Sequence, residues 1–441
     1  MSTCPSGNYH PKEISREVEN PRKAAFDPGA KQSLSRCWRK RRSDTLGGML
    51  PSLSIGFPPG ASVGASVVDR PVHSPSASRW PVCILGVPLD AVTMDEALAR
   101  IDEMVASGRP HYVVTPNVDF LVQARGNQEL HRILCEADLV LCDGQPLVWA
   151  SRWLGNPLPE RVAGADLAPR LMAQAARKGH RVYLLGATPE SNDEACRRLL
   201  ERHPTLQIAG HYAPPFAPLE EMDHEALICR IRAAEPDILL VSFGCPKQER
   251  WIARNYRALG VPVCLGLGAT IDFLAGRVRR APAWMQRSGL EWTYRLLQEP
   301  RRLFRRYWTD VRHFGTALLG QWWSLGWKAR AKAGGALRII STNARWQHVR
   351  ATGALDRPAL ERAAEICRRL GEGTRNCRLE LAEVDSLDST GVAALTVWQR
   401  RLRRAGRKLV LFRPNDHVRR LLREAGLLHL ETTDGLGRGH A

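Results

Sequence analysis

Short apolar runs alternate with helical segments between residues 80 and 276 of this chain. Parallel strands are joined by crossover connections that are usually helices, and strands buried on both faces are continuously apolar. The alternation therefore predicts an α/β domain, with a Rossmann-like, mostly parallel sheet and helices on both of its faces. Strands are expected at His111–Thr115, Leu139–Cys142, Arg181–Gly186, Asp237–Ser242 and Pro262–Leu267, and helices at Asp119–Cys135, Ala165–Lys178, Ser191–Arg202 and Glu220–Ala234.

Three further regions surround this domain. Residues 1–79 are rich in Ser, Pro, Gly and Arg without periodicity, which is typical of a disordered basic leader, although a start codon assigned too far upstream would give the same pattern. Residues 277–333 are helical and rich in Arg and Trp. Residues 334–435 predict a second, smaller α/β domain. Its strands are expected at Leu337–Ser341, Arg378–Leu381 and Lys408–Phe412, and its helices at Arg357–Leu370, Thr390–Ala405 and Asp416–Ala425.

The chain is strongly basic, with 64 Lys and Arg against 45 Asp and Glu and a net charge of +19. This charge favours an anionic membrane surface or a phosphorylated substrate over nucleic acid, because we find no zinc-finger spacing, RNP-like run or recognition helix. The 11 cysteines include no CxxC pair, which favours reduced thiols in the cytoplasm over disulfides or a metal site. No apolar run is long enough for a transmembrane helix, so we expect any membrane contact to be peripheral.

Polar residues gather in the turns that follow the predicted strands. The carboxyl ends of parallel strands meet at one sheet edge, where open α/β folds bind ligands. Hydroxyl, amide and free backbone N–H groups at such an edge suit a nucleotide, and the Asp143 carboxylate can accept a proton from a sugar hydroxyl. Ordinary turn chemistry is the alternative, with Asn117 and Asp119 as helix caps and Asp143 in an Asx turn.

Six motifs in consecutive order resemble those of the WecG/TagA/CpsF glycosyltransferases, over residues 80–310. They are Thr-Pro-Asn-Val-Asp-Phe at 115–120, Cys-Asp-Gly at 142–144, Arg-Val-Ala-Gly-Ala-Asp at 161–166, Leu-Leu-Gly-Ala at 184–187, Gly-Cys-Pro-Lys-Gln-Glu at 244–249 and Gly-Ala-Thr-Ile-Asp-Phe-Leu-Ala-Gly at 268–276. The resemblance implies an inverting enzyme of cell-surface polysaccharide synthesis. It would move a sugar from a UDP-sugar to an undecaprenyl-diphosphate-linked sugar at the cytoplasmic face of the membrane.

By the same resemblance, Asp143 is the candidate catalytic base, and neither a metal ion nor another cofactor is needed. The positions that match substrate-binding residues of the family are Thr115, Asn117, Arg161 and Gln248. We add Gly186 and Lys247 to the predicted substrate-binding set, because their turns lie at the same sheet edge. The residues themselves show no Asp-x-Asp pair placed to hold Mg²⁺, which leaves arginines and helix N-termini to neutralise the departing UDP.

Two other functions are weighed against this one. Dinucleotide binding would require a GxGxxG motif after the first strand, where Gly86 stands alone. A non-catalytic regulatory protein that binds partners on a degenerate transferase scaffold would not need Asp143, Asn117 and Gln248 to be intact. The oligomeric state is left open, a homo-oligomer included.

Residues 301–327 have the composition of a helix that lies in a membrane interface. Apolar residues recur every three or four positions, arginines fall off that stripe, and tryptophans follow. The stripe comprises Leu303, Phe304, Tyr307, Trp308, Val311, Phe314 and Leu318, and the arginines are Arg301, Arg302, Arg305, Arg306 and Arg312. A core-packing helix with solvated charges is the alternative. The family resemblance favours the membrane and would let Arg279, Arg280 and Arg287 meet the acceptor diphosphate.

The sequence Asp-Ser-Thr-Gly at 388–391, between a predicted strand and a predicted helix, resembles the motif of STAS domains of the anti-sigma-factor-antagonist type. The resemblance implies a regulatory or docking module that binds a protein partner, with Ser389 as the candidate phosphorylation site. A simple helix cap at Asp388 or Ser389 is the alternative. The Gly334-Gly335 break and the helix before it are expected to separate Ser389 from the transferase edge.

Overall fold

The computed structural model describes residues 79–278, 281–282, 285, 291–298, 300–329 and 334–427. All of them belong to one compact unit that spans Arg70–Ala441. The predicted leader, apart from its last residue, lies outside the described residues.

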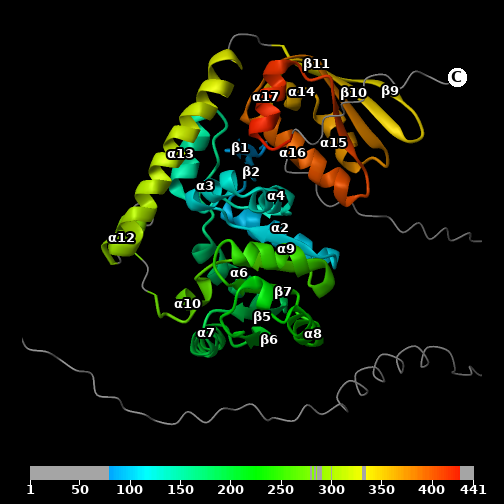
Figure 1. Cartoon of the computed structure of the whole chain (residues 1–441). Helices are drawn as coiled ribbons and strands as arrows, with labels where there is room; N and C mark the ends of the chain where they lie inside the picture. Colours follow the sequence, from blue (N-terminus) through cyan, green and yellow to red (C-terminus); the bar gives the residue numbers. More distant parts are fainter. Residues whose placement is uncertain are drawn as a thin grey trace, which may run out of the picture. The chain divides into compact units, whose positions relative to one another are not determined.

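The larger part of this unit is built on a six-stranded sheet in the order β4-β3-β8-β7-β5-β6 (Figure 1). Every neighbouring pair in this sheet is parallel. The strands are β3 His111–Val114, β4 Leu139–Val140, β5 Arg181–Gly186, β6 Gln207–Tyr212, β7 Ile238–Ser242 and β8 Val263–Gly266. The predicted Rossmann-like α/β architecture is confirmed.

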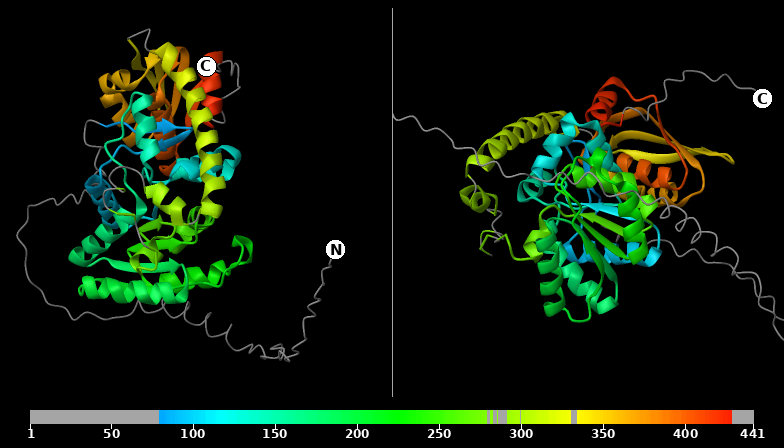
Figure 2. Two further views of the ribbon diagram at one scale, coloured as in Figure 1. Left: turned by 90° about the vertical axis from the view of Figure 1, so that its left-hand side faces the viewer. Right: turned by 60° about the horizontal axis from the view of Figure 1, so that its bottom comes forward.

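Helices cover both faces of the sheet, as Figure 2 shows. Side chains of successive strand residues point to opposite faces, so Tyr112 and Val114 join one core cluster and Val113 joins the other. The first face is covered by α3 Val118–Gly126, α4 Gln128–Glu136, α8 His224–Ala234 and α9 Lys247–Leu259. The second face is covered by α2 Met94–Ser107, α6 Gly164–Lys178, α7 Pro189–Arg202 and α10 Thr270–Leu274. One further helix, α5 Gln145–Trp153, follows β4.

Several elements differ from the sequence-based prediction. The single helix expected at Asp119–Cys135 is two helices, because Asn127 ends α3 and its side chain caps α4 by accepting from Leu130 N. Strand β6 was not predicted, since its residues are only partly buried and its sequence, Gln-Ile-Ala-Gly-His-Tyr, lacks an apolar run. The apolar residues near Cys83 form a separate antiparallel hairpin, β1 Val82–Ile84 with β2 Val87–Leu89.

Two helices follow the sheet domain, α12 Glu291–Gln298 and α13 Pro300–Ala329. The predicted apolar stripe of α13 divides between two surfaces. Phe314 and Leu318 are buried in the transferase core cluster, whereas Phe304, Trp308 and Val311 are exposed. Among the described residues, no helix combines the length and the apolar character needed to cross a membrane.

The C-terminal part has a four-stranded sheet in the order β12-β11-β10-β9, in which only β9 and β10 are antiparallel. Its elements are β9 Ala336–Thr342, β10 Trp346–Leu355, α14 Arg357–Arg362, α15 Ala364–Glu372, β11 Asn376–Leu387, α16 Ser389–Arg404, β12 Leu409–Phe412 and α17 Asp416–Glu424. The second α/β domain is therefore present. Strand β10 was not predicted, because its polar and basic residues hide the alternation of a half-buried strand.

Candidate active site

The structure brings Thr115, Asn117 and Asp143 together at the carboxyl edge of β3 and β4. Asp143 N donates to Pro116 O at 3.0 Å, and Asp143 Oδ2 accepts from Gly164 N at 3.2 Å. A Cβ atom on Gly164 would lie 3.4 Å from Thr115 Oγ1 and 3.8 Å from Asp143 Oδ2. The start of α6 thus lies against both side chains, and its N–H groups face the carboxylate, a favourable position for negative charge.

Asn117 also caps α3, because its side-chain oxygen accepts from Phe120 N at 3.3 Å. The capping alternative considered from the sequence is therefore real for this residue, and it fixes the side chain beside the Asp143 turn. The Cβ of Asn117 lies 3.7 Å from the position that a Cβ on Gly144 would take.

Arg161 is held by two carboxylates. It donates to Asp166 Oδ2 at 2.8 Å and to Glu291 Oε2 at 3.1 Å, and its side chain is only 16% exposed. Glu291 lies on α12, so this ion pair joins the helical segment to the sheet edge. No sequence pattern predicts the role of Glu291, which is separated from Arg161 by 130 positions.

Gln248 connects two turns from within. Its side-chain oxygen accepts from Gly244 N at 3.1 Å and from Gly268 N at 3.0 Å, while its Nε2 donates to Glu249 Oε1 at 2.7 Å. The residue is 1% exposed. Burial raises the pKa of Glu249 to about 7, although bonds from Gln248, from its own backbone and from Cys245 act in the opposite direction.

Gly186 and Lys247 occupy the more distant half of the edge. Gly186 has a φ of +105°, and a Cβ there would lie 2.5 Å from Ser242 O, so the close approach of β5 and β7 requires glycine. Lys247 donates to Ala217 O, and its ammonium lies 5.3 Å from the rings of Phe216 and Phe243. The predicted acceptor-binding residues Arg279, Arg280 and Arg287 lie outside the described residues.

Comparisons with known proteins identify the family of the chain. Residues 82–327 match the model of the "Glycosyl transferase WecG/TagA/CpsF family", and residues 340–432 match that of the "Mlab, STAS domain". The chain belongs to the WecG/TagA/CpsF family of glycosyltransferases.

Two relatives come from Staphylococcus aureus, strains MW2 and MRSA252, and both are named N-acetylglucosaminyldiphosphoundecaprenol N-acetyl-beta-D-mannosaminyltransferase. Each is 31% identical over 226 residues, which is 51% of this chain and 87% of the relative. One solved structure, the unphosphorylated anti-sigma factor antagonist SpoIIAA, is 21% identical with a TM-score of 0.21, and the match covers 22% of this chain and 85% of that one.

The motif of the STAS-like domain is tightly packed in this transferase. Asp388 caps α16 by accepting from Gly391 N at 2.7 Å, and a Cβ on Gly391 would lie 2.1 Å from Leu355 O. Ser389 is 1% exposed, and its hydroxyl donates to Leu154 O at 3.5 Å. The expected separation of Ser389 from the transferase domain is therefore wrong, because Leu154 directly follows α5.

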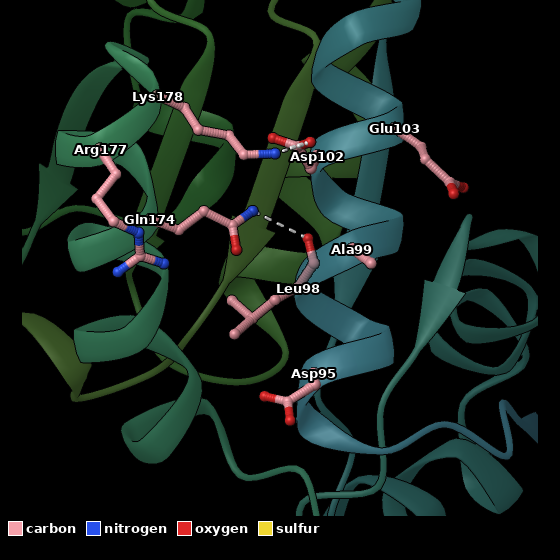
Figure 3. Close-up of a pocket in the computed structure, with 8 residues that line it drawn as sticks. All are labelled: Asp95, Leu98, Ala99, Asp102, Glu103, Gln174, Arg177 and Lys178. Carbon is pink, nitrogen blue, oxygen red and sulfur yellow. Dashed lines mark hydrogen bonds and ion pairs between the residues drawn. The ribbon is translucent and has the colours of Figure 1, made fainter.

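A hollow lies between α2 and α6, on one face of the sheet and away from the carboxyl edge (Figure 3). It has a volume of about 380 Å³, and Asp95, Leu98, Asp102, Gln174 and Lys178 are among the residues that line it. Lys178 and His180 bond to Asp102 and lower the pKa of its carboxyl, even though burial acts to raise it. Asp102 is thus held in place by two neighbouring basic side chains.

Proposed function

We propose that the protein is an inverting glycosyltransferase that moves a sugar, an N-acetylhexosamine or hexose, from a UDP-sugar to a polyprenyl-diphosphate-linked sugar in the synthesis of a cell-surface polysaccharide. The position of the Asp143 carboxylate beside Thr115 and Asn117, at the carboxyl edge of a parallel sheet, carries the proposal. The name of the relatives, which describes a transferase acting on a lipid-diphosphate sugar, supports the acceptor class.

In the proposed reaction, an acceptor hydroxyl attacks the anomeric carbon of the donor. A carbon–oxygen bond forms to the acceptor while the anomeric carbon–oxygen bond to UDP breaks, with inversion at that carbon. The Asp143 carboxylate takes the hydroxyl proton. Thr115 and Asn117 orient the sugar. The guanidinium of Arg161, which pairs with Asp166 and Glu291, binds the departing diphosphate by exchanging one of these carboxylates for a phosphate oxygen.

We propose that the reaction needs no metal ion, because arginine and helix N-termini can neutralise the diphosphate. Activity should then persist in excess EDTA. A loss of activity in EDTA that Mg²⁺ restores would show that the diphosphate is held by a metal ion instead.

The decisive assay measures UDP release from a panel of UDP-sugars, with and without a polyprenyl-diphosphate-GlcNAc acceptor. We expect acceptor-dependent release with at least one N-acetylhexosamine donor. Absence of release with every donor and acceptor pair, from folded protein, would favour the non-catalytic regulatory alternative.

The outer face of α13 supports a peripheral position on the cytoplasmic face of the membrane. Five large apolar side chains on this helix are more than half exposed, although Phe314 and Leu318 of the same helix are buried in the core. They are Phe304, Trp308, Val311, Leu319 and Trp323. Arg305 and Arg312 are exposed on the same helix. Aromatic side chains beside cations are suited to an anionic lipid surface.

Vesicle binding tests this surface. Replacing Trp308 and Trp323 with Ser should weaken binding to anionic vesicles by about tenfold or more, since each buries a large apolar area in lipid. Phe216→Ser is the matched control, because Phe216 is a fully exposed aromatic residue that lies on the loop after β6 and not on α13. If the double variant bound vesicles as tightly as the wild type, the outer face would not be the lipid contact.

A further inference from the structure

The strand that leads to Asp143 is poorly anchored by its own sheet. Strand β4 has two residues and lies at the edge of the sheet, where it pairs only with β3, through Leu139 with Val113 and Val140 with Val114. A short edge strand has few ladder hydrogen bonds, so its position depends on contacts outside the sheet.

Asp90 occupies the open side of this strand. Its backbone N–H donates to Val140 O at 2.9 Å, and its Oδ2 accepts from Val140 N at 2.9 Å. The other carboxylate oxygen lies 4.0 Å from Arg400 on α16 and 3.5 Å from Arg100. Arg400 is largely buried, at 9% side-chain exposure, and it also donates to Ala137 O.

Asp138 is held in the same way at the start of the strand. It is 4% exposed, accepts from Tyr112 N at 3.0 Å and from the His111 ring at 2.7 Å, and forms an ion pair with Arg404 of α16. Arg404 also donates to Glu136 O at 2.6 Å. The backbone just before β4 is thus bound by the C-terminal turn of a helix from the other domain.

The same helix reaches the segment beyond Asp143. Helix α5 begins at Gln145, and the carbonyl oxygen that directly follows it, Leu154 O, accepts from Ser389 at the first turn of α16. Helix α16, which has 16 residues, therefore contacts the chain on both sides of the Asp143 turn. Its last turn contacts the segment before β4, and its first turn contacts the residue after α5.

We propose that the STAS-like domain is a structural part of the active edge, and that Arg400 and Arg404 are positioning residues that hold β4 and so fix Asp143. The inference rests on the proposed function only for the role of Asp143. It assigns the α16 face to the transferase domain of its own chain, so an external protein partner would have to displace that domain to bind there.

Full-length variants test this assignment. With Arg404→Ala and the double variant Arg400→Ala/Arg404→Ala, we expect kcat to fall roughly tenfold to a hundredfold, because a displacement of about 1 Å at a reacting group has effects of this size. The KM for the donor and the affinity for UDP should change less than about threefold, as the β7 half of the edge is untouched. Arg404→Lys should restore part of kcat by returning the charge beside Asp138.

Arg403→Ala is the matched control, because Arg403 is exposed and pairs with the partly exposed Glu136 side chain. It should leave kcat within about twofold of the wild type. Hydrogen exchange gives a readout that does not depend on turnover. Amides of residues 139–144 should exchange faster in Arg404→Ala, while those of β7 keep their protection. If Arg404→Ala unfolds the protein, Arg404→Ala/Asp138→Asn removes the unpaired charge and is measured instead.

Three outcomes would overturn the proposal: unchanged kcat in the folded double variant, unchanged exchange at residues 139–144, or a fall in kcat that Arg403→Ala reproduces. Failure of the proposed function would look different. If Asp143→Asn turned over like the wild type, Asp143 would not be the base, yet the exchange result would still show whether α16 holds β4.

Discussion

The two halves of the carboxyl edge are held in place by different means. On the β7 and β8 side, uncharged groups of the sheet domain itself hold the turns, through the Gln248 amide and the close backbone contact at Gly186. On the β4 side, the Asp143 turn depends on charged groups from a distant part of the chain, such as Arg404 with Asp138.

Neutral hydrogen bonds hold one half of the site, and ion pairs hold the other. Buried neutral hydrogen bonds make the β7–β8 half rigid without outside help. In the β4 half, Asp143 accepts from Gly164 N, and the charged supports lie at the strand start, away from this carboxylate. The difference predicts that substitutions on the two sides will affect turnover and stability unequally.

The largest effect should come from Asp143, the proposed catalytic base. Asp143→Asn should lower kcat by about 100- to 10,000-fold, because the amide cannot accept the hydroxyl proton. The affinity for UDP, measured by calorimetry, should stay near that of the wild type. Asp193→Asn, at a 70% exposed carboxylate on α7, is the control. It should leave both kcat and the affinity for UDP unchanged. Wild-type turnover by Asp143→Asn would remove Asp143 from the mechanism.

Gln248→Ala tests the β7–β8 half. It leaves Gly244 N and Gly268 N without their acceptor in a buried place, so the free energy of unfolding should fall by about 2–4 kcal/mol. Both turns should also loosen, which would raise the KM for the donor. The control is Gln123→Ala on α3, which should cost less than about 0.5 kcal/mol in urea unfolding. Equal losses in the two variants would contradict a special role for the buried amide.

Much of the β7–β8 half could be predicted from sequence. The apolar run before Phe243, the Gly-Cys-Pro turn and the polar helix start describe the local geometry, and Gln248 was placed at the edge correctly. Its inward orientation was not foreseen, since residue type does not tell whether an amide faces a ligand or a backbone N–H group.

The β4 half could be predicted only in part. Asp143 followed from its strand and its motif, and Ser389 and Gly391 from the STAS resemblance. The contacts of Arg400 and Arg404 could not be predicted, because they join positions more than 260 apart. In the sequence, the two arginines look like solvated charges on a helix. Long-range ion pairs leave no periodic pattern. For the same reason the sequence wrongly suggested that Ser389 stands apart from the transferase.

Glu249→Gln tests how far the neutral half depends on pH. Since burial raises the pKa of Glu249 to about 7, the folded state binds more protons than the unfolded state between pH 4.5 and 7. This group's contribution to stability is therefore present at acidic pH and falls as pH rises through that range. As pH rises from 5 to 8, the free energy of unfolding of the wild type should fall relative to that of Glu249→Gln by on the order of 2 kcal/mol. Parallel stability curves would show that Glu249 is not protonated in the folded protein.

The smallest effect is a titration that reports on the charged half. Burial, together with the guanidinium groups of Arg404 and Arg109, lowers the pKa of His111 to about 4, so the neutral ring donates to Asp138. As pH falls from 6.5 towards 4, His111 is protonated in the unfolded state but stays neutral in the folded state. The free energy of unfolding therefore falls over that pH range. Arg404→Ala should raise the pKa of His111, measured by NMR. The pH range over which stability is lost should then become narrower. Arg403→Ala should leave it unchanged. An unmoved His111 titration in Arg404→Ala would mean that the Arg404 charge does not act on the start of β4.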